Sequence, residues 1–126
     1  MKVSITQSRH GFTDGILPEA CASRTVLDHV TSKWGVLVLV ALSEQTLRWG
    51  ELRRVVEGGS EKMLAQTLRT LEADGFVLRL AHPVIPPRVE YSLTNRGREL
   101  AQRLLPLMDW IADKADSILE GHSAAR

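Results

Sequence analysis

The sequence predicts a single, mainly helical domain with one small β-hairpin. Three observations lead to this prediction. The chain has 126 residues, 44% of them hydrophobic and 25% charged, which is typical of one globular domain. Apolar residues recur at helical spacing in several segments, of which residues 60–73 and 95–120 are the longest. Residues 76–80, where Arg79 lies between apolar neighbours, and residues 89–93, which alternate apolar and polar side chains, are expected to be half-buried strands.

Composition also excludes several classes of protein. The longest apolar run, residues 36–42, is far too short to span a membrane, and residues 1–12 lack the apolar core of a secretory signal. Cys21 is the only cysteine, so neither an intramolecular disulfide nor a thiolate metal cluster is possible. The four histidines lack metal-ligand spacing, and no nucleophile has an orienting partner. We expect a cytoplasmic protein that is not an enzyme and uses no cofactor, metal or membrane.

The first half of the chain predicts an arm and three short helices. Residues 1–18 lack periodicity and form the expected N-terminal arm. A helix follows, with Ser23 as its expected N-cap. The uniformly apolar segment 34–42 is expected to be a buried central helix, with a strand as the alternative. A short extended piece at 46–49 leads into a helix over residues 50–56. The inward positions of that helix are Leu52, Val55 and Val56.

A glycine turn separates this helix from the next one. Glu57-Gly58-Gly59 is a strong turn signal, and Ser60 is the expected cap of a helix over residues 60–73 that stops at Gly75. The helix is predicted to have two faces. Its core face comprises Met63, Leu64, Leu68 and Leu71. Its opposite face comprises Lys62, Gln66, Arg69 and Ala73, at steps of four, three and four.

The two alternating segments are expected to pair as a hairpin. Their connection contains Pro83, Pro86 and Pro87, which remove hydrogen-bond donors and stiffen the tip. Two helices joined by a glycine turn and followed by such a hairpin describe a winged helix-turn-helix, here over residues 19–94.

The last predicted helix is capped by Thr94 and runs over residues 95–120, within a C-terminal segment 95–126. Pro106 is expected to kink it near Gln102. A helix of this length, about 39 Å, is longer than the diameter of the small winged helix-turn-helix domain that precedes it. Apolar side chains at its far end would therefore be exposed to solvent. These are Trp110, Ile111, Ile118 and Leu119. We therefore expect a homodimer formed through the N- and C-terminal helices.

Charge is distributed unevenly along the chain. Residues 48–98 carry nine basic and six acidic groups (net +3), whereas residues 1–47 are neutral overall and residues 99–126 are net −2. A positive middle segment favours a polyanionic partner, and we expect double-stranded DNA. Glutamine suits adenine edges, arginine suits guanine edges, and a helix N-terminus suits phosphate. The expected DNA contacts are Ser60, Lys62, Gln66, Thr67 and Arg69 on the helix, and Arg79, His82 and Arg88 on the hairpin.

Three residues of the hairpin also have structural interpretations that do not involve DNA. Arg88 is as well suited to a carboxylate of its own chain as to phosphate. Glu90 repels DNA and is expected to be structural, while Tyr91 is expected to belong to the core.

Several segments resemble the HxlR family of bacterial transcription regulators. They are LRWGELRR at residues 47–54, SEKMLAQTLR at 60–69, LEADGFV at 71–77, and residues 83–94, whose PPRVEY run is highly specific. Cys21 and Lys33-Trp34 match as well. The resemblance covers residues 21–112 and implies a dimeric winged-helix repressor or activator, related in shape to the MarR group. Three positions depart from the family pattern: Trp49, Gly59 and His82.

The expected function is a repressor that binds a near-palindromic operator as a homodimer. Some relatives sense oxidants or electrophiles through a cysteine at the position of Cys21. A helix N-terminus and nearby Arg24 favour its thiolate, and an inert buried thiol is the alternative. Two other functions stay open. One is a regulator gated by a non-covalent ligand, with Trp34 and Trp110 lining its pocket. The other is a winged-helix module that binds proteins.

Overall fold

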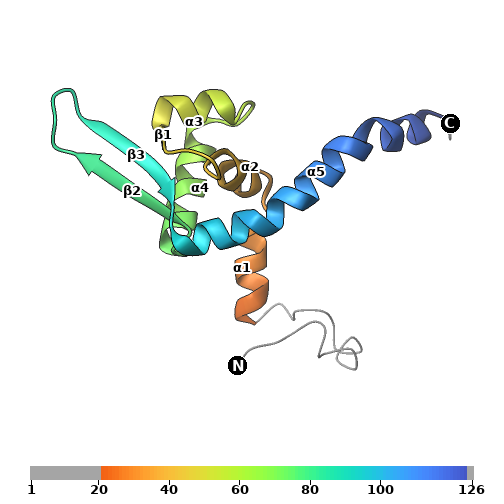
Figure 1. Cartoon of the computed structure of the whole chain (residues 1–126), viewed down its shortest axis with the longest axis horizontal. Helices are drawn as coiled ribbons and strands as arrows, with labels where there is room; N and C mark the ends of the chain where they lie inside the picture. Colours follow the sequence, from red (N-terminus) through yellow and green to blue (C-terminus); the bar gives the residue numbers. More distant parts are fainter. Residues whose placement is uncertain (1–20, 125–126) are drawn as a thin grey trace.

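The fold is mainly helical, as predicted, with one small antiparallel sheet. The computed structural model describes residues 21–124, and the predicted arm at residues 1–18 lies outside them. Over this range the helices are α1 (Ala22–Val30), α2 (Lys33–Ala41), α3 (Trp49–Val55), α4 (Glu61–Ala73) and α5 (Asn95–Ala124). The strands are β1 (Leu47–Arg48), β2 (Val77–His82) and β3 (Arg88–Leu93). The β2–β3 hairpin, here called the wing, projects from the helical body on the side away from α5 (Figure 1).

Helix α2 is the centre of the core. It begins after Ser32, whose hydroxyl oxygen accepts a hydrogen bond from the Gly35 N–H at 3.0 Å. Val38 and Leu39 are completely buried, and α2 packs against α1, α3, α4 and α5. The helical interpretation of this apolar segment is therefore confirmed over the strand alternative. Because α2 lies among these four helices, the burial of its apolar side chains is its main contribution to the stability of the fold.

The start of α1 differs from the prediction. The helix begins at Ala22, so Cys21 occupies the N-cap position and Ser23 lies inside the first turn. The Cys21 side chain makes no capping hydrogen bond, while its carbonyl oxygen accepts from the Arg24 N–H at 3.2 Å. Ser23 as N-cap is thus wrong, because the chain enters the helical conformation two residues earlier than the nearest hydroxyl suggested.

The turn between α3 and α4 is built around Trp34. Gly58 adopts a left-handed backbone conformation with φ +94°, which a side chain would strain. A Cβ at Gly59 would lie 3.3 Å from the Trp34 ring. Gly59, a departure from the family pattern, therefore has a packing reason.

Leu52 and Val56 of α3 are buried as predicted, but Val55 is exposed. Helix α3 is only two turns long, and its outer side faces solvent.

The sheet has three strands in the order β1-β3-β2, so the predicted hairpin gains a third strand. Arg48 pairs with Glu90 across β1 and β3, while Arg79 pairs with Tyr91 and His82 with Arg88 across β2 and β3. Directly paired residues point to the same face of a sheet. One face carries buried Val77, Tyr91 and Leu93 toward the helices. We call the other face, which carries residues 48, 78, 80, 82, 88 and 90, the outer wing face.

Helix α5 is longer than predicted, with 30 residues, and runs without a break through Pro106. The Gly97 N–H donates to the Thr94 hydroxyl oxygen at 3.0 Å, as expected of a cap. The kink near Gln102 stays a prediction. Beyond the N-terminal part that packs against the other elements, α5 exposes a series of large apolar side chains: Leu107, Trp110, Ile111, Ile118 and Leu119. No helix within residues 21–124 is both long and apolar enough to cross a membrane.

Candidate nucleic-acid interface

Helix α4 presents a polar stripe to solvent and a leucine face to the core. Leu64, Leu68 and Leu71 are buried, whereas Lys62, Gln66 and Arg69 are exposed on the opposite side. None of these three polar side chains makes a hydrogen bond or ion pair with another residue of the range 21–124. Their donors and acceptors are therefore available to a ligand. Met63 was expected on the core face, but it is 45% exposed and lies on the flank of the helix.

The N-terminus of α4 is fixed before any ligand arrives. The Ser60 hydroxyl oxygen accepts from the Met63 N–H at 3.1 Å, which confirms the predicted cap. Arg53 of α3 donates to the Glu61 carboxylate at 2.7 Å. This contact offsets the negative charge beside Ser60 and Lys62, and it ties the two helices of the helix-turn-helix together. The contact is exposed, so its net contribution to stability is small.

Thr67 lies apart from the polar stripe. It is half-buried and lines a groove of about 340 Å³ between α4 and the junction of α1 with α2. The groove also contains His29, Met63 and Thr70, and Gln66 borders it. The five contacts predicted on this segment thus divide into a group at the N-terminus, an outward stripe, and Thr67 on one flank.

The wing separates the three basic residues predicted on it. Arg79 is exposed on the face that also carries Tyr91, whereas His82 and Arg88 lie on the outer wing face. Glu90 lies between these two. Its Oε1 atom is 3.2 Å from His82 Nε2 and 3.1 Å from Arg88 Nε. Of the two interpretations of Arg88, the structure shows the pairing with a carboxylate of its own chain. Glu90 has the expected structural role, and Tyr91 is buried in the core as predicted.

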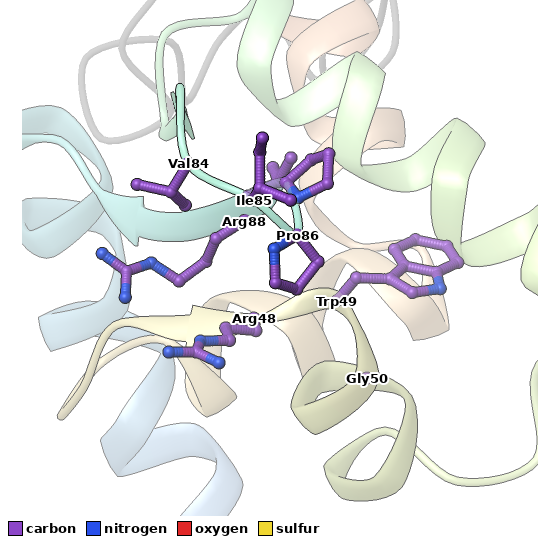
Figure 2. Close-up of a pocket in the computed structure, with 9 residues that line it drawn as sticks. Arg48, Trp49, Gly50, Val84, Ile85, Pro86 and Arg88 are labelled. Carbon is purple, nitrogen blue, oxygen red and sulfur yellow. The ribbon is translucent and has the colours of Figure 1, made fainter.

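Arg48 is a cation that the sequence reasoning missed. It lies in β1 beside Glu90, and it lines a groove of about 530 Å³ with Trp49, Arg88 and residues of the wing tip. Figure 2 shows the guanidinium groups of Arg48 and Arg88 on one side of this groove and the Trp49 ring on the other. Pairing the extended piece at residues 46–49 with the hairpin would have revealed this position, because it places Arg48 directly opposite Glu90.

A polar joint connects the end of α4 with α1 and α5. His29 Nδ1 lies 2.7 Å from the Asp74 carboxylate, and Arg96 donates to the Asp74 carbonyl oxygen at 2.9 Å. The Thr94 hydroxyl donates to the Gly75 carbonyl oxygen at 2.6 Å. A Cβ at Gly97 would lie 2.1 Å from the Phe76 carbonyl oxygen, so the first turn of α5 packs directly on the α4–β2 link. The orientation of α4 is thereby coupled to both flanking helices.

Cys21 lies away from the polar stripe, at the start of α1. It is partly exposed, and whether its thiol reacts stays a prediction. Arg24, expected to favour the thiolate, lies 3.6 Å from Asp28 within α1. In the part of the chain that the structure describes, no cluster of three or more His, Cys, Asp or Glu side chains could hold a metal ion.

Comparison with known proteins agrees with this geometry. Residues 29–118 match the model of a family described as HxlR-like helix-turn-helix. The chain belongs to this family. Its members are helix-turn-helix transcriptional regulators rather than enzymes. The chain is similar to an uncharacterized HTH-type transcriptional regulator of Escherichia coli, YtfH, with 57% identity over 96 residues, or 76% of each chain.

Solved structures of the family share the fold. A YtfH transcriptional regulator from Salmonella typhimurium is 50% identical with a TM-score of 0.80, covering 86% of this chain and 96% of that one. The redox regulator HypR in its reduced form is 33% identical with a TM-score of 0.71, covering 79% of this chain and 99% of that one. The described fold is therefore a winged helix-turn-helix of the MarR type. As a family member, the chain is a transcriptional regulator with a DNA-binding helix-turn-helix.

Proposed function

We propose that the protein is a cytoplasmic, homodimeric repressor that binds a near-palindromic operator through α4. The observation that supports this most directly is the unpartnered polar stripe of Lys62, Gln66 and Arg69 on a helix fixed by its leucine face. Gln66 and Arg69 read base edges in the major groove, while Ser60 and Lys62 contact phosphate near the helix N-terminus. Thr67 contacts DNA from the flank of the helix.

The wing supplies the remaining contacts. Arg79 and the outer-face pair His82 and Arg88 hold the backbone or the adjacent minor groove. Arg88 reaches phosphate while its Nε atom stays beside Glu90, since a guanidinium has further donors. Arg48 extends this cationic surface along the same face.

Substitution of Arg69 tests whether α4 contacts the base edges of the operator. An operator is first selected from a random DNA pool with the wild-type protein. Arg69→Ala is expected to weaken binding by about 1–3 kcal/mol, or roughly 5- to 150-fold, and to relax the preference at one base pair. Arg103→Ala is the matched control, since Arg103 is an exposed arginine on α5 that donates to the Glu99 carbonyl oxygen. If Arg69→Ala binds the operator with unchanged affinity, the polar stripe of α4 is not the face that contacts the bases.

A salt titration separates DNA binding from the alternative of a protein-binding module. Several phosphate contacts release counterions, so the logarithm of the binding constant is expected to fall steeply and linearly with the logarithm of salt concentration. A flat dependence would favour the protein-binding alternative.

Dimerisation is supported by the apolar surface that α5 and α1 leave exposed. Trp110 and Leu119 are 55% and 61% exposed on α5, and Val26 and Leu27 are partly exposed on α1. A second copy covers these residues and sets the two α4 helices about one DNA turn, roughly 34 Å, apart. Leu119→Glu is expected to shift sedimentation toward the monomer, while the exposed Ser117→Glu is not. A wild-type protein that sediments as a monomer contradicts this part of the proposal.

A thiol response at Cys21 is the proposed signal, and it is supported by the similarity to the redox regulator HypR. With one cysteine per chain, an oxidant would remove two electrons and two protons from two thiols. The thiols are Cys21 of both subunits, or Cys21 and a small-molecule thiol. Cys21→Ser is expected to keep operator binding and to lose release by oxidant. If the variant still releases DNA, the thiol is not the sensor. A thermal shift with candidate ligands then tests gating by a non-covalent ligand.

A further inference from the structure

The tip of the wing presents an apolar side chain to solvent. Ile85 is 100% exposed, and the neighbouring Val84 is 46% exposed. We infer that Ile85 is a wedge that enters the minor groove beside the α4 site and partly unstacks one base step of the operator. This inference rests on the proposed DNA binding and adds to it the position and chemistry of a second recognition element.

The exposure of Ile85 is not explained by the fold of the monomer. Buried apolar side chains of the sheet lie at the root of the wing, where Val77 and Leu93 contact the body. Two six-residue strands carry the tip about 20 Å away from that root. A large aliphatic side chain at this distance gains nothing from the core and is available for contact with a ligand.

The tip is also stiff, which lowers the entropic cost of insertion. Pro83 precedes the exposed pair and Pro86 and Pro87 follow it, so three backbone φ angles are fixed. The Val84 N–H donates to the His82 carbonyl oxygen at 2.8 Å and closes a tight turn. Pro86 lines one groove together with Trp49, and Figure 2 shows its ring directed toward the start of α3. Ile85 is therefore held at the apex of a preformed loop.

Charge identifies nucleic acid as the occupant. Arg48 and Arg88 lie on the outer wing face, and Arg79 lies on the other face. The one acidic residue in the three strands and the tip is Glu90, and it lies against His82 and Arg88. Three arginines and the exposed apolar side chains Leu78, Leu80, Val84 and Ile85 therefore share the wing, and this combination matches a groove with apolar base edges between two rows of phosphates. Architectural proteins insert apolar side chains into the minor groove in this way.

The preferred base step follows from the cost of unstacking. Pyrimidine–purine steps such as TA and CA unstack most easily. We therefore expect the selected operator to carry such a step at the position reached by each wing, outside the bases read by α4. DNA bound by the wild-type protein is expected to bend at that step.

The test uses the full chain and its selected operator, with 2-aminopurine placed at successive positions under the wing. Unstacking raises the fluorescence of this base. Wild-type protein is expected to give a rise at one step, and Ile85→Ala is expected to abolish it and to weaken binding about tenfold. That estimate takes a partly inserted isoleucine as losing about half the contact of a buried one. Val84→Ala, one residue away, is the matched control and is expected to keep the fluorescence rise.

The outcomes separate the wedge from the proposed function. If the wild-type protein binds its operator specifically but no position gains fluorescence, the wedge is wrong and DNA reading by α4 stands. An Ile85→Ala variant with wild-type affinity and wild-type fluorescence also overturns the wedge. If no specific DNA binding is found, both proposals fail. Ile85 is fully exposed, so an unchanged melting temperature of Ile85→Ala verifies that loss of the signal does not reflect unfolding.

Discussion

The contact between His29 and Asp74 offers a direct measurement of how firmly α1 holds the end of α4. His29 Nδ1 lies 2.7 Å from the Asp74 carboxylate, and the two side chains are 33% and 20% exposed. A hydrogen bond to a charged group contributes about 1.5–3 kcal/mol when it is well buried. Partial exposure to solvent reduces this value, so we expect a coupling free energy of about 1 kcal/mol.

A double-mutant cycle isolates this coupling. The free energy of unfolding is measured by urea denaturation for the wild-type protein, His29→Ala, Asp74→Ala and the double variant. Since the joint also orients α4, His29→Ala is expected to weaken operator binding several-fold beyond its effect on folding. Asp28→Asn is the matched control, because Asp28 is exposed on the same helix and pairs with Arg24 instead. If the two single effects add to within about 0.3 kcal/mol, the contact contributes no coupling and the reasoning is refuted.

Three further predictions concern the joint, the core and the phosphate contacts. Gly97→Ala places a Cβ 2.1 Å from the Phe76 carbonyl oxygen and is expected to destabilise folding by about 2–3 kcal/mol in thermal melts. Gly121→Ala, whose Cβ meets open space on the same helix, is expected to stabilise it slightly, and equal effects of the two would contradict the packing argument. Leu52→Ala, at a completely buried position, is expected to cost about 2–5 kcal/mol by urea denaturation, and a loss below about 1 kcal/mol would show that α3 is not anchored by this residue. Lys62→Ala is expected to weaken DNA binding similarly for all sequences and to reduce the salt slope by about one, whereas a sequence-dependent loss would assign Lys62 to base reading.

Long periodic segments were the part of the fold that the sequence predicted well. The leucine face of α4 follows from periodicity, and the buried α2 follows from its uniformly apolar composition, although that composition left a strand as the alternative. Strand β1 was not predicted as part of the sheet, because a strand of two residues is too short to show alternation. Met63 and Val55 were misplaced because periodicity gives the direction of a side chain but not the extent of the neighbour that would cover it.

The sequence predicted individual residues of the candidate site but not how they lie relative to one another. Arg79 and His82 lie three residues apart on one strand, so alternation alone puts them on opposite faces. Placing Arg88 on the face of His82 requires the strand register, which the sequence left unassigned. The polar joint was missed because its partners, His29 and Asp74, are 45 residues apart and neither belongs to a recognisable motif. Long-range polar pairs of this kind become visible only when the helices are placed in space. The start of α1 was wrong for a local reason, since helix boundaries depend on backbone conformation more than on the nearest hydroxyl.

Because α5 is long, a small change in its tilt produces a large displacement at its end. A rod of 30 residues is about 45 Å long, and its first turn packs on the link that ends α4. If such a rod tilts by about 5°, one end moves by about 4 Å relative to the other, which is more than the rise of one base pair. In the proposed dimer, a change too small to disturb the packing of the other helices would therefore be enough to move the two α4 helices out of register with successive major grooves.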